Sequence, residues 1–183
     1  MITVLGNLQS EAVAADGMRG ADQMISRQRP PQISARLLAQ ANQDNTSVQI
    51  SLSKQRAYLL VNGEIAIDTP ISSGKSVGMT PTGKFKVTEK DADHRSNIYG
   101  NFVDSQGRVV RAGVSLKVDS APSGTHYLGA PMRWFMRFSG AVGMHVGHLP
   151  GYPASHGCVR MPGEIAPLFY KNVKYGTSVT VMH

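Results

Sequence analysis

The chain has 183 residues, of which 41% are hydrophobic, and its formal net charge at pH 7 is +7. This length suits one globular domain with a real core, and no run approaches the roughly 18 apolar residues that a membrane-spanning helix needs. The single cysteine excludes an intramolecular disulfide. Because the basic residues are scattered along the chain, the charge favours an anionic polymer as partner and argues against a nucleic-acid-binding patch.

Residues 1–45 differ in composition from the rest of the chain, being rich in Ala, Gln, Asp and Gly. Adjacent Pro30 and Pro31 enforce extended backbone, and residues 33–43 have the pattern of a short helix. We therefore expect residues 1–45 to be a poorly structured N-terminal tail or linker with one short helix. The first residues lack the basic n-region of a signal peptide, so we expect a chain trimmed of an export signal.

From residue 46 the pattern changes to β-strands, and we expect one domain over residues 46–183. Asn62-Gly63 is a strong hairpin signal, because both turn positions tolerate positive φ. It joins two expected strands at 56–61 and 64–72, and alternation or β-branched content predicts others at 48–52, 80–90, 107–118, 133–139 and 176–182. We interpret the remaining polar stretches between residues 91 and 129 as long loops around one strand.

One principal helix is expected over residues 162–173, with Pro162 and Glu164 in its first turn and Lys171 near its end. Its apolar face would be formed by Ile165, Leu168 and Phe169. Together these elements predict a mainly β fold of the sandwich or barrel kind, with this helix as its principal helical element.

The stretch "MHVGHLPGYPASHGCVRMP" (144–162) holds Cys158 and three of the six histidines. Three interpretations compete for it. Imidazole and thiolate are zinc ligands, although the paired cysteines or nearby Glu of typical zinc sites are missing. The segment is alternatively an ordinary loop with a buried cysteine. The third interpretation is a cysteine nucleophile, in which an imidazole takes the thiol proton and a small neighbour leaves backbone N–H groups open.

The order of residues supports the third interpretation through a resemblance. His145 followed by Ser155-His156-Gly157-Cys158-Val159-Arg160 resembles the signature of the L,D-transpeptidase catalytic domain family (YkuD type). Residues 50–87, with their strand pairs and "TPTGKF" turn, and the ending "GTSVTV" are similar to the same family. The resemblance extends over about residues 48–181 and implies an L,D-transpeptidase catalytic fold.

The resemblance implies roles for individual residues. Cys158 would be the nucleophile and His145 the general base, its ring oriented by a backbone carbonyl. His156 would shape the site and Gly157 would supply an oxyanion-hole backbone donor. Substrate contacts are expected from Arg160, Ser155 and Tyr127. His148 has no counterpart in the family, and the interval between His145 and the Ser155–Arg160 box is shorter than in most members.

The implied reaction is acyl transfer on peptidoglycan stem peptides without metal or cofactor. Cys158 would form a thioester with a stem tetrapeptide, release D-Ala and pass the acyl group to an amine, giving a 3→3 cross-link. Water as acceptor would give an L,D-carboxypeptidase, and a lysine of a wall protein would give protein anchoring. We expect a monomer in the periplasm or cell wall. Gly74, Met79, Thr80 and Trp134 are further candidates for the cleft lining.

Overall fold

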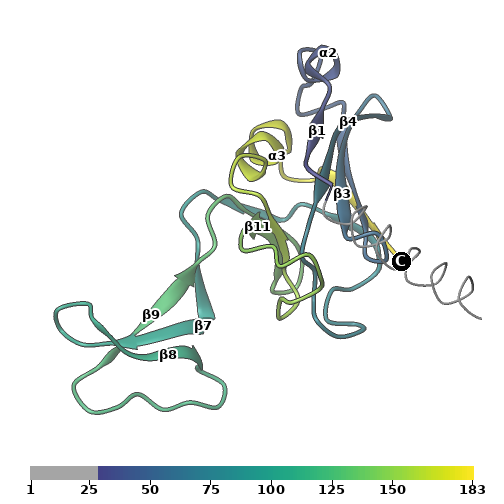
Figure 1. The fold of residues 1–183 in the computed structure, drawn as a ribbon. Coiled ribbons are helices and arrows are strands. Elements are labelled where there is room, and N and C mark those ends of the chain that lie inside the picture. The colour runs from purple at the N-terminus through teal and green to yellow at the C-terminus, as the bar shows by residue number, and fades with distance from the viewer. Residues whose placement is uncertain (1–28) are drawn as a thin grey trace, which may run out of the picture.

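The computed structural model describes residues 29–183, which form three β-sheets and two short helices (Figure 1). The largest sheet has six strands in the order β1-β4-β3-β2-β13-β5, and β13 runs parallel to β2 while the other neighbours are antiparallel. Its strands are β1 (Gln32–Ile33), β2 (Thr46–Ser51), β3 (Arg56–Val61), β4 (Glu64–Pro70), β5 (Gly83–Lys86) and β13 (Ser178–Met182).

The predicted hairpin is confirmed between β3 and β4. Asn62 and Gly63 adopt φ values of 51° and 84°. Two positive φ values in a two-residue loop match the twist of the flanking strands. Here a local sequence signal determined strand pairing directly.

A second sheet of four strands, in the order β12-β11-β10-β6, packs against the first. It contains β6 (Glu89–Asp91), β10 (Phe135–Ser139), β11 (Val142–Val146) and β12 (Val159–Met161). The Phe85 ring, from the first sheet, lies 5.6 Å from the Phe138 ring of the second. One buried cluster joins the two sheets, with members Val48, Ile50, Leu59, Ile67, Val179, Met136, Phe138, Met144, Val159 and Met161. The prediction of a mainly β, sandwich-like fold is confirmed.

The principal helix is shorter than predicted. It is α3 (Ala166–Asn172), and residues 163–165 form a turn before it. Pro167 explains the late start, because a proline lacks the N–H group and is tolerated in the first turn alone. Pro162 and Glu164 therefore lie outside the helix. No helix in residues 29–183 combines the length and apolar character needed to cross a membrane.

The expected helix at residues 33–43 is a single turn, α2 (Ala35–Leu38), with Ser34 as its N-cap. Leu37 from this turn is buried against Val61 and Ala66. Residues 32–38 thus add a strand and a turn to the edge of the six-stranded sheet. The expected domain boundary near residue 45 stays a prediction, and the part of the proposed tail in residues 1–28 lies outside the described residues.

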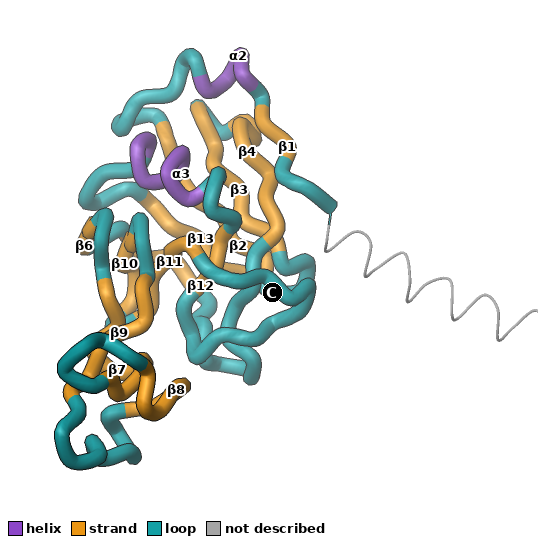
Figure 2. Tube along the Cα trace, turned by 60° about the vertical axis from the view of Figure 1, so that its left-hand side comes forward, coloured by secondary structure: helices purple, strands orange, loops and turns teal. Residues whose placement is uncertain are grey.

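Residues 95–131 are not the long loops around one strand that we expected. They form an antiparallel sheet, β8-β7-β9, from β7 (Arg95–Val103), β8 (Val109–Ser115) and β9 (His126–Pro131). Figures 1 and 2 show this sheet projecting from the two-sheet body. The strand expected at residues 107–118 is confirmed as β8. We did not predict β7 and β9, because they pair in an exposed sheet and lack the apolar alternation of a strand that faces a core.

Candidate active site

Cys158 is brought to His145 by strand pairing. It directly precedes β12, and β12 runs parallel to β11 with Met144 opposite Val159 and His145 opposite Arg160. The loop of residues 147–158 joins the two strands. Because the two strands are parallel neighbours, the start of β12 lies beside the middle of β11. The short interval between His145 and the box therefore still brings His145 and Cys158 to the same place.

The box is held in a tight turn by Ser155 and Thr80. The Ser155 hydroxyl accepts from the Gly157 N–H at 3.0 Å and donates to the Cys158 carbonyl at 2.5 Å. The Thr80 hydroxyl donates to the Gly157 carbonyl at 2.6 Å and accepts from the Gly74 N–H at 2.9 Å. Gly157 has a φ of 133°, and a Cβ there would lie 2.8 Å from the Met79 carbonyl oxygen, so the turn requires glycine.

This turn changes the expected roles of two residues. The Gly157 N–H is bound to Ser155, so it is not free to stabilise an oxyanion in this arrangement. The backbone N–H of Cys158 makes no hydrogen bond to any residue in the range 29–183. Ser155 is buried and, although it borders the pocket, its hydroxyl is engaged with the backbone of the box rather than open to substrate.

His145 is buried, with 6% of its surface exposed, and its Nδ1 lies 2.7 Å from the Val146 carbonyl oxygen. A carbonyl accepts only, so Nδ1 carries the proton and Nε2 is left as an acceptor. Burial lowers the pKa of His145 to about 4, an effect opposed by the Val146 hydrogen bond and reinforced by the charges of Arg160 and His94. The imidazole is therefore neutral at pH 7 and able to accept a proton.

Burial raises the pKa of the Cys158 thiol, while the Gly143 N–H and the charges of Arg137 and Arg160 act in the opposite direction. The sulfur lies 3.7 Å from the Ala141 carbonyl oxygen, which accepts from the thiol. With a raised thiol pKa and a lowered imidazole pKa, the resting pair is neutral rather than thiolate and imidazolium. A thiol in this state can react as a nucleophile only when a base takes its proton.

Both residues line a pocket of about 450 Å³. Three cationic side chains border it, Lys117, Arg137 and Arg160, and no Asp or Glu does so among the described residues. Arg137 is paired with Glu89 at 2.6 Å, whereas the Arg160 guanidinium has no ion pair within residues 29–183. The pocket therefore suits an anionic ligand. Its other lining residues are His94, Ser96, Asn97, Ile98, Tyr99, Ala130, Pro131, Met132, Ala141, Val142, Val146, Gly147, His148, Ser155 and His156.

Arg160 is positioned by a glycine. A Cβ on Gly147 would lie 2.7 Å from Cγ of Arg160 and 2.9 Å from its Cβ and Cδ. The absence of a side chain at residue 147 thus leaves the space that the arginine stem occupies. Arg160 as a whole is half-buried, and it borders the pocket as His145 does.

His156 and Tyr99 connect the box to the projecting sheet. Their rings stack at 4.3 Å with an interplanar angle of 13°. Burial is the main cause that lowers the pKa of His156, and the charges of Lys75 and Arg160 lower it further. The stack joins the box to the projecting sheet, and the site-shaping role of His156 stays a prediction.

Tyr127 does not line the pocket. Its hydroxyl donates to the Ser96 carbonyl at 3.0 Å, and its ring packs edge-on against Phe102. Tyr99, on the neighbouring strand, is the tyrosine that borders the pocket. The sequence carried no signal for this choice, because both tyrosines lie in a stretch that we interpreted as mostly loops.

Three further residues that we expected in the cleft lining lie elsewhere. Gly74 and Thr80 border a separate cavity of about 220 Å³. Trp134 packs edge-on against Tyr170 at 5.2 Å. His148 borders the main pocket. His94 and Arg137 also border it, and sequence analysis missed both as site residues because only tertiary packing brings them there.

A model of the L,D-transpeptidase catalytic domain family (YkuD) matches residues 45–181. The chain belongs to this family. The match covers the Cys158 box, His145 and the four-stranded sheet, together with β2 to β5 of the six-stranded sheet, so the L,D-transpeptidase resemblance predicted from the sequence is confirmed. A comparison with curated proteins gave no match.

Solved structures of L,D-transpeptidases share the fold. The enzyme of Xylanimonas cellulosilytica matches with a TM-score of 0.55 and 22% identity over 96% of this chain and 70% of its own. That of Stackebrandtia nassauensis matches with 0.55 and 16% over 89% of this chain, which spans 64% of that protein's length. The structure of LdtMt1 in complex with imipenem matches with 0.52 and 22% over 75% of this chain and 58% of its own.

Proposed function

We propose that this protein is an L,D-transpeptidase that uses Cys158 as its nucleophile on peptidoglycan stem peptides. One observation carries the proposal. In a chain of the L,D-transpeptidase family, parallel pairing of β11 and β12 places Cys158 and a neutral, buried His145 in one pocket with a positive lining. No partner chain is needed to complete this set, and we expect the protein to act as a monomer.

The first half of the reaction is acylation. Nε2 of His145 accepts the Cys158 thiol proton as sulfur attacks the carbonyl of the third residue of a stem tetrapeptide. The Cys158 N–H, which has no partner in residues 29–183, donates to the developing oxyanion. His145 then gives its proton to the amine of the departing D-Ala, leaving a thioester. Arg160 is the candidate for binding a substrate carboxylate, because this half-buried residue borders the pocket and has no ion pair among the described residues.

The second half is transfer of the acyl group. An amine of a second stem peptide gives a 3→3 cross-link, and this is the outcome that we propose. Water in place of the amine gives L,D-carboxypeptidase activity, and a lysine of a wall protein gives anchoring. Because these substrates lie outside the cytoplasmic membrane, we place the protein in the periplasm or cell wall.

The decisive experiment is intact-mass analysis after incubation with a stem tetrapeptide or with imipenem, the ligand of the LdtMt1 structure. Cys158 is the chain's one cysteine, so a thioester adduct has one possible sulfur. We expect a mass increase in the wild type and none in Cys158→Ala. In His145→Gln, acylation should slow about 10²–10⁴-fold.

His126→Gln is the matched control, because His126 lies exposed on β9 outside the pocket. Its acylation rate should equal that of the wild type. Acylation of Cys158→Ala, or an absence of any adduct in the folded wild type with both reagents, would contradict the proposal. Product analysis with and without an acceptor peptide then separates cross-linking from hydrolysis.

A further inference from the structure

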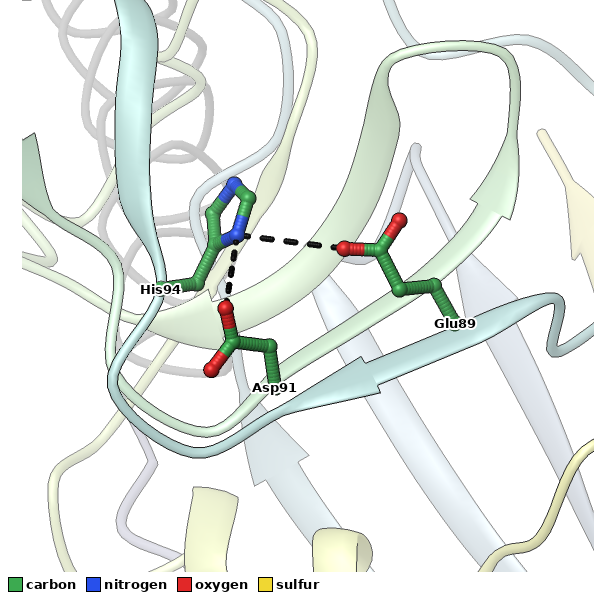
Figure 3. A group of neighbouring side chains, drawn as sticks. All are labelled: Glu89, Asp91 and His94. Carbon is green, nitrogen blue, oxygen red and sulfur yellow. Dashed lines mark hydrogen bonds and ion pairs between the residues drawn. The ribbon is translucent and has the colours of Figure 1, made fainter.

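A histidine outside the Cys158 machinery borders the same pocket. His94 follows β6, and its Nδ1 lies 3.2 Å from Oδ2 of Asp91 and 3.9 Å from Oε1 of Glu89 (Figure 3). The other ring nitrogen is turned away from both carboxylates in Figure 3. An ionised carboxylate only accepts, so this contact puts an N–H group on Nδ1, and in the singly protonated ring Nε2 is the nitrogen that can accept a proton.

The ring of His94 is held from several directions. It stacks on Phe135 at 4.2 Å with an interplanar angle of 12°, and its side chain is 19% exposed. Arg137 donates from Nε to Oε2 of Glu89 at 2.6 Å. Locked orientation of an imidazole by a carboxylate is the arrangement that general bases use.

Glu89, Asp91 and His94 also have the spacing of a metal-binding group, since one ligand atom from each lies within 4.8 Å of the others. The pairing of Arg137 with Glu89 cancels one of the two negative charges, however. Asp91 is likewise engaged with His94. The cluster is better explained as a network that orients His94 than as a cation site.

The proposed transfer step requires the removal of one proton from the acceptor, and His145 does not take that proton. During acylation His145 takes one proton from the thiol and returns it to the leaving amine, so it enters the second half neutral. An acceptor amine is mostly an ammonium at pH 7 and has no lone pair for attack. A base at the side of the pocket where the acceptor enters would remove this obstacle.

His94 is suitably placed for that task. One part of the pocket lining comes from His94, residues 96–99 and residues 130–132, and another comes from the box residues Ser155, His156, Cys158 and Arg160. Among the described residues, His94 is the one histidine in the first of these two parts of the lining. An acceptor amine that reaches Cys158 along this part of the pocket would pass His94.

We propose that His94, oriented by Asp91, is a second base that deprotonates the acceptor ammonium during transfer, an inference that rests on the proposed function. The ammonium gives one proton to Nε2 of His94, and the free amine attacks the thioester carbonyl. The C–N bond forms and the C–S bond breaks. His145 passes the second amine proton to the departing Cys158 sulfur, the third proton stays on the new amide, and His94 releases its proton to water.

The test compares transfer rates per acyl-enzyme formed, in the wild type and in His94→Gln, with two acceptors. For a primary alkylamine acceptor at pH 7, transfer in His94→Gln should fall about 100-fold, the lower range for loss of a general base. Hydroxylamine is already neutral at this pH and needs no base, so its transfer rate should change little. His126→Gln is the control variant and should match the wild type with both acceptors.

Asp91 is a positioning residue in this scheme, and Asp91→Asn should lower alkylamine transfer by about 10-fold while sparing hydroxylamine. Equal losses with both acceptors would mean a structural role for His94 and would overturn the inference. Equal alkylamine transfer in the wild type and His94→Gln would overturn it too, with the proposed function intact. A wild type that forms no acyl-enzyme would instead remove the proposed function, and this inference with it.

Discussion

The body of two packed sheets and the projecting sheet β8-β7-β9 bury very different amounts of apolar surface. The body shares one cluster that includes α3, whereas the buried apolar side chains of the projecting sheet are Phe102, Val103 and Val114. Val109 and Val110 on β8 are more than half exposed. Both regions nevertheless border the candidate active-site pocket. Cys158 and His145 thus lie on the well-packed body, while part of the pocket comes from a sheet held mainly by backbone pairing.

The largest difference should come from truncating apolar side chains in the two regions. Phe169 on α3 is fully buried in the body, so Phe169→Ala should lower the free energy of unfolding by about 3–5 kcal/mol. Leu128 on β9 is 38% exposed, and Leu128→Ala should cost less than about 1 kcal/mol. Urea denaturation measures both. Equal losses of unfolding free energy in the two variants would contradict this comparison, because the projecting sheet would then contribute as much to stability as the body does.

The pH dependence of stability should report the buried histidine of the body. The folded-state pKa of His145 is about 4, below the ordinary 6.5, so the unfolded chain binds more protons between these values. Stability from this group is complete above pH 6.5 and is lost as the pH falls to 4, by about 3 kcal/mol in total. The measurement is the difference between wild type and His145→Gln in denaturant unfolding at pH 7 and pH 4.

His126→Gln provides the comparison for that prediction, because His126 is exposed on the projecting sheet. Its unfolding free energy should follow the wild type at both pH values. A difference between wild type and His145→Gln that stays constant from pH 7 to pH 4 would mean that His145 titrates normally.

Gly129→Ala should loosen the projecting sheet without unfolding the body. A Cβ at Gly129 would lie 2.0 Å from the Ser96 carbonyl oxygen, so β7 and β9 must move apart locally. We expect a cost of about 1–3 kcal/mol, confined to faster hydrogen exchange of amides in β7 and β9. Gly163→Ala, in the body, is the control, because its nearest neighbour would be Val146 at 4.0 Å. Faster exchange throughout the body would contradict independent opening of the sheet.

The smallest effect should come from the contact between the two regions. Tyr99→Leu removes the ring stacked on His156 and should cost about 1 kcal/mol. Because burial holds the pKa of His156 down, that pKa should rise toward its ordinary value, as an NMR titration of the imidazole would show. Tyr152→Leu changes an exposed tyrosine and should leave the titration of His156 as in the wild type. An unchanged His156 titration in Tyr99→Leu would show that the stack does not shield it.

Sequence reasoning worked where the signal was local. The Asn62-Gly63 turn needs two positive φ values, and the strands around it have apolar faces toward one core, so pattern and structure agree. The family signature around Cys158 is likewise a contiguous pattern. The polar strand β7 escaped prediction, since pairing in an exposed sheet requires no apolar alternation.

The amino-acid sequence by itself determined the mainly β class, the hairpin, the family and the presence of a single thiol. Tertiary structure alone decided that Tyr99 rather than Tyr127 borders the pocket, that the Gly157 N–H is used within the box, and that His94 shares a cavity with Cys158. The physical reason is that a turn or a strand depends on neighbouring residues, whereas the neighbours of a pocket are set by how separate strands pair and pack.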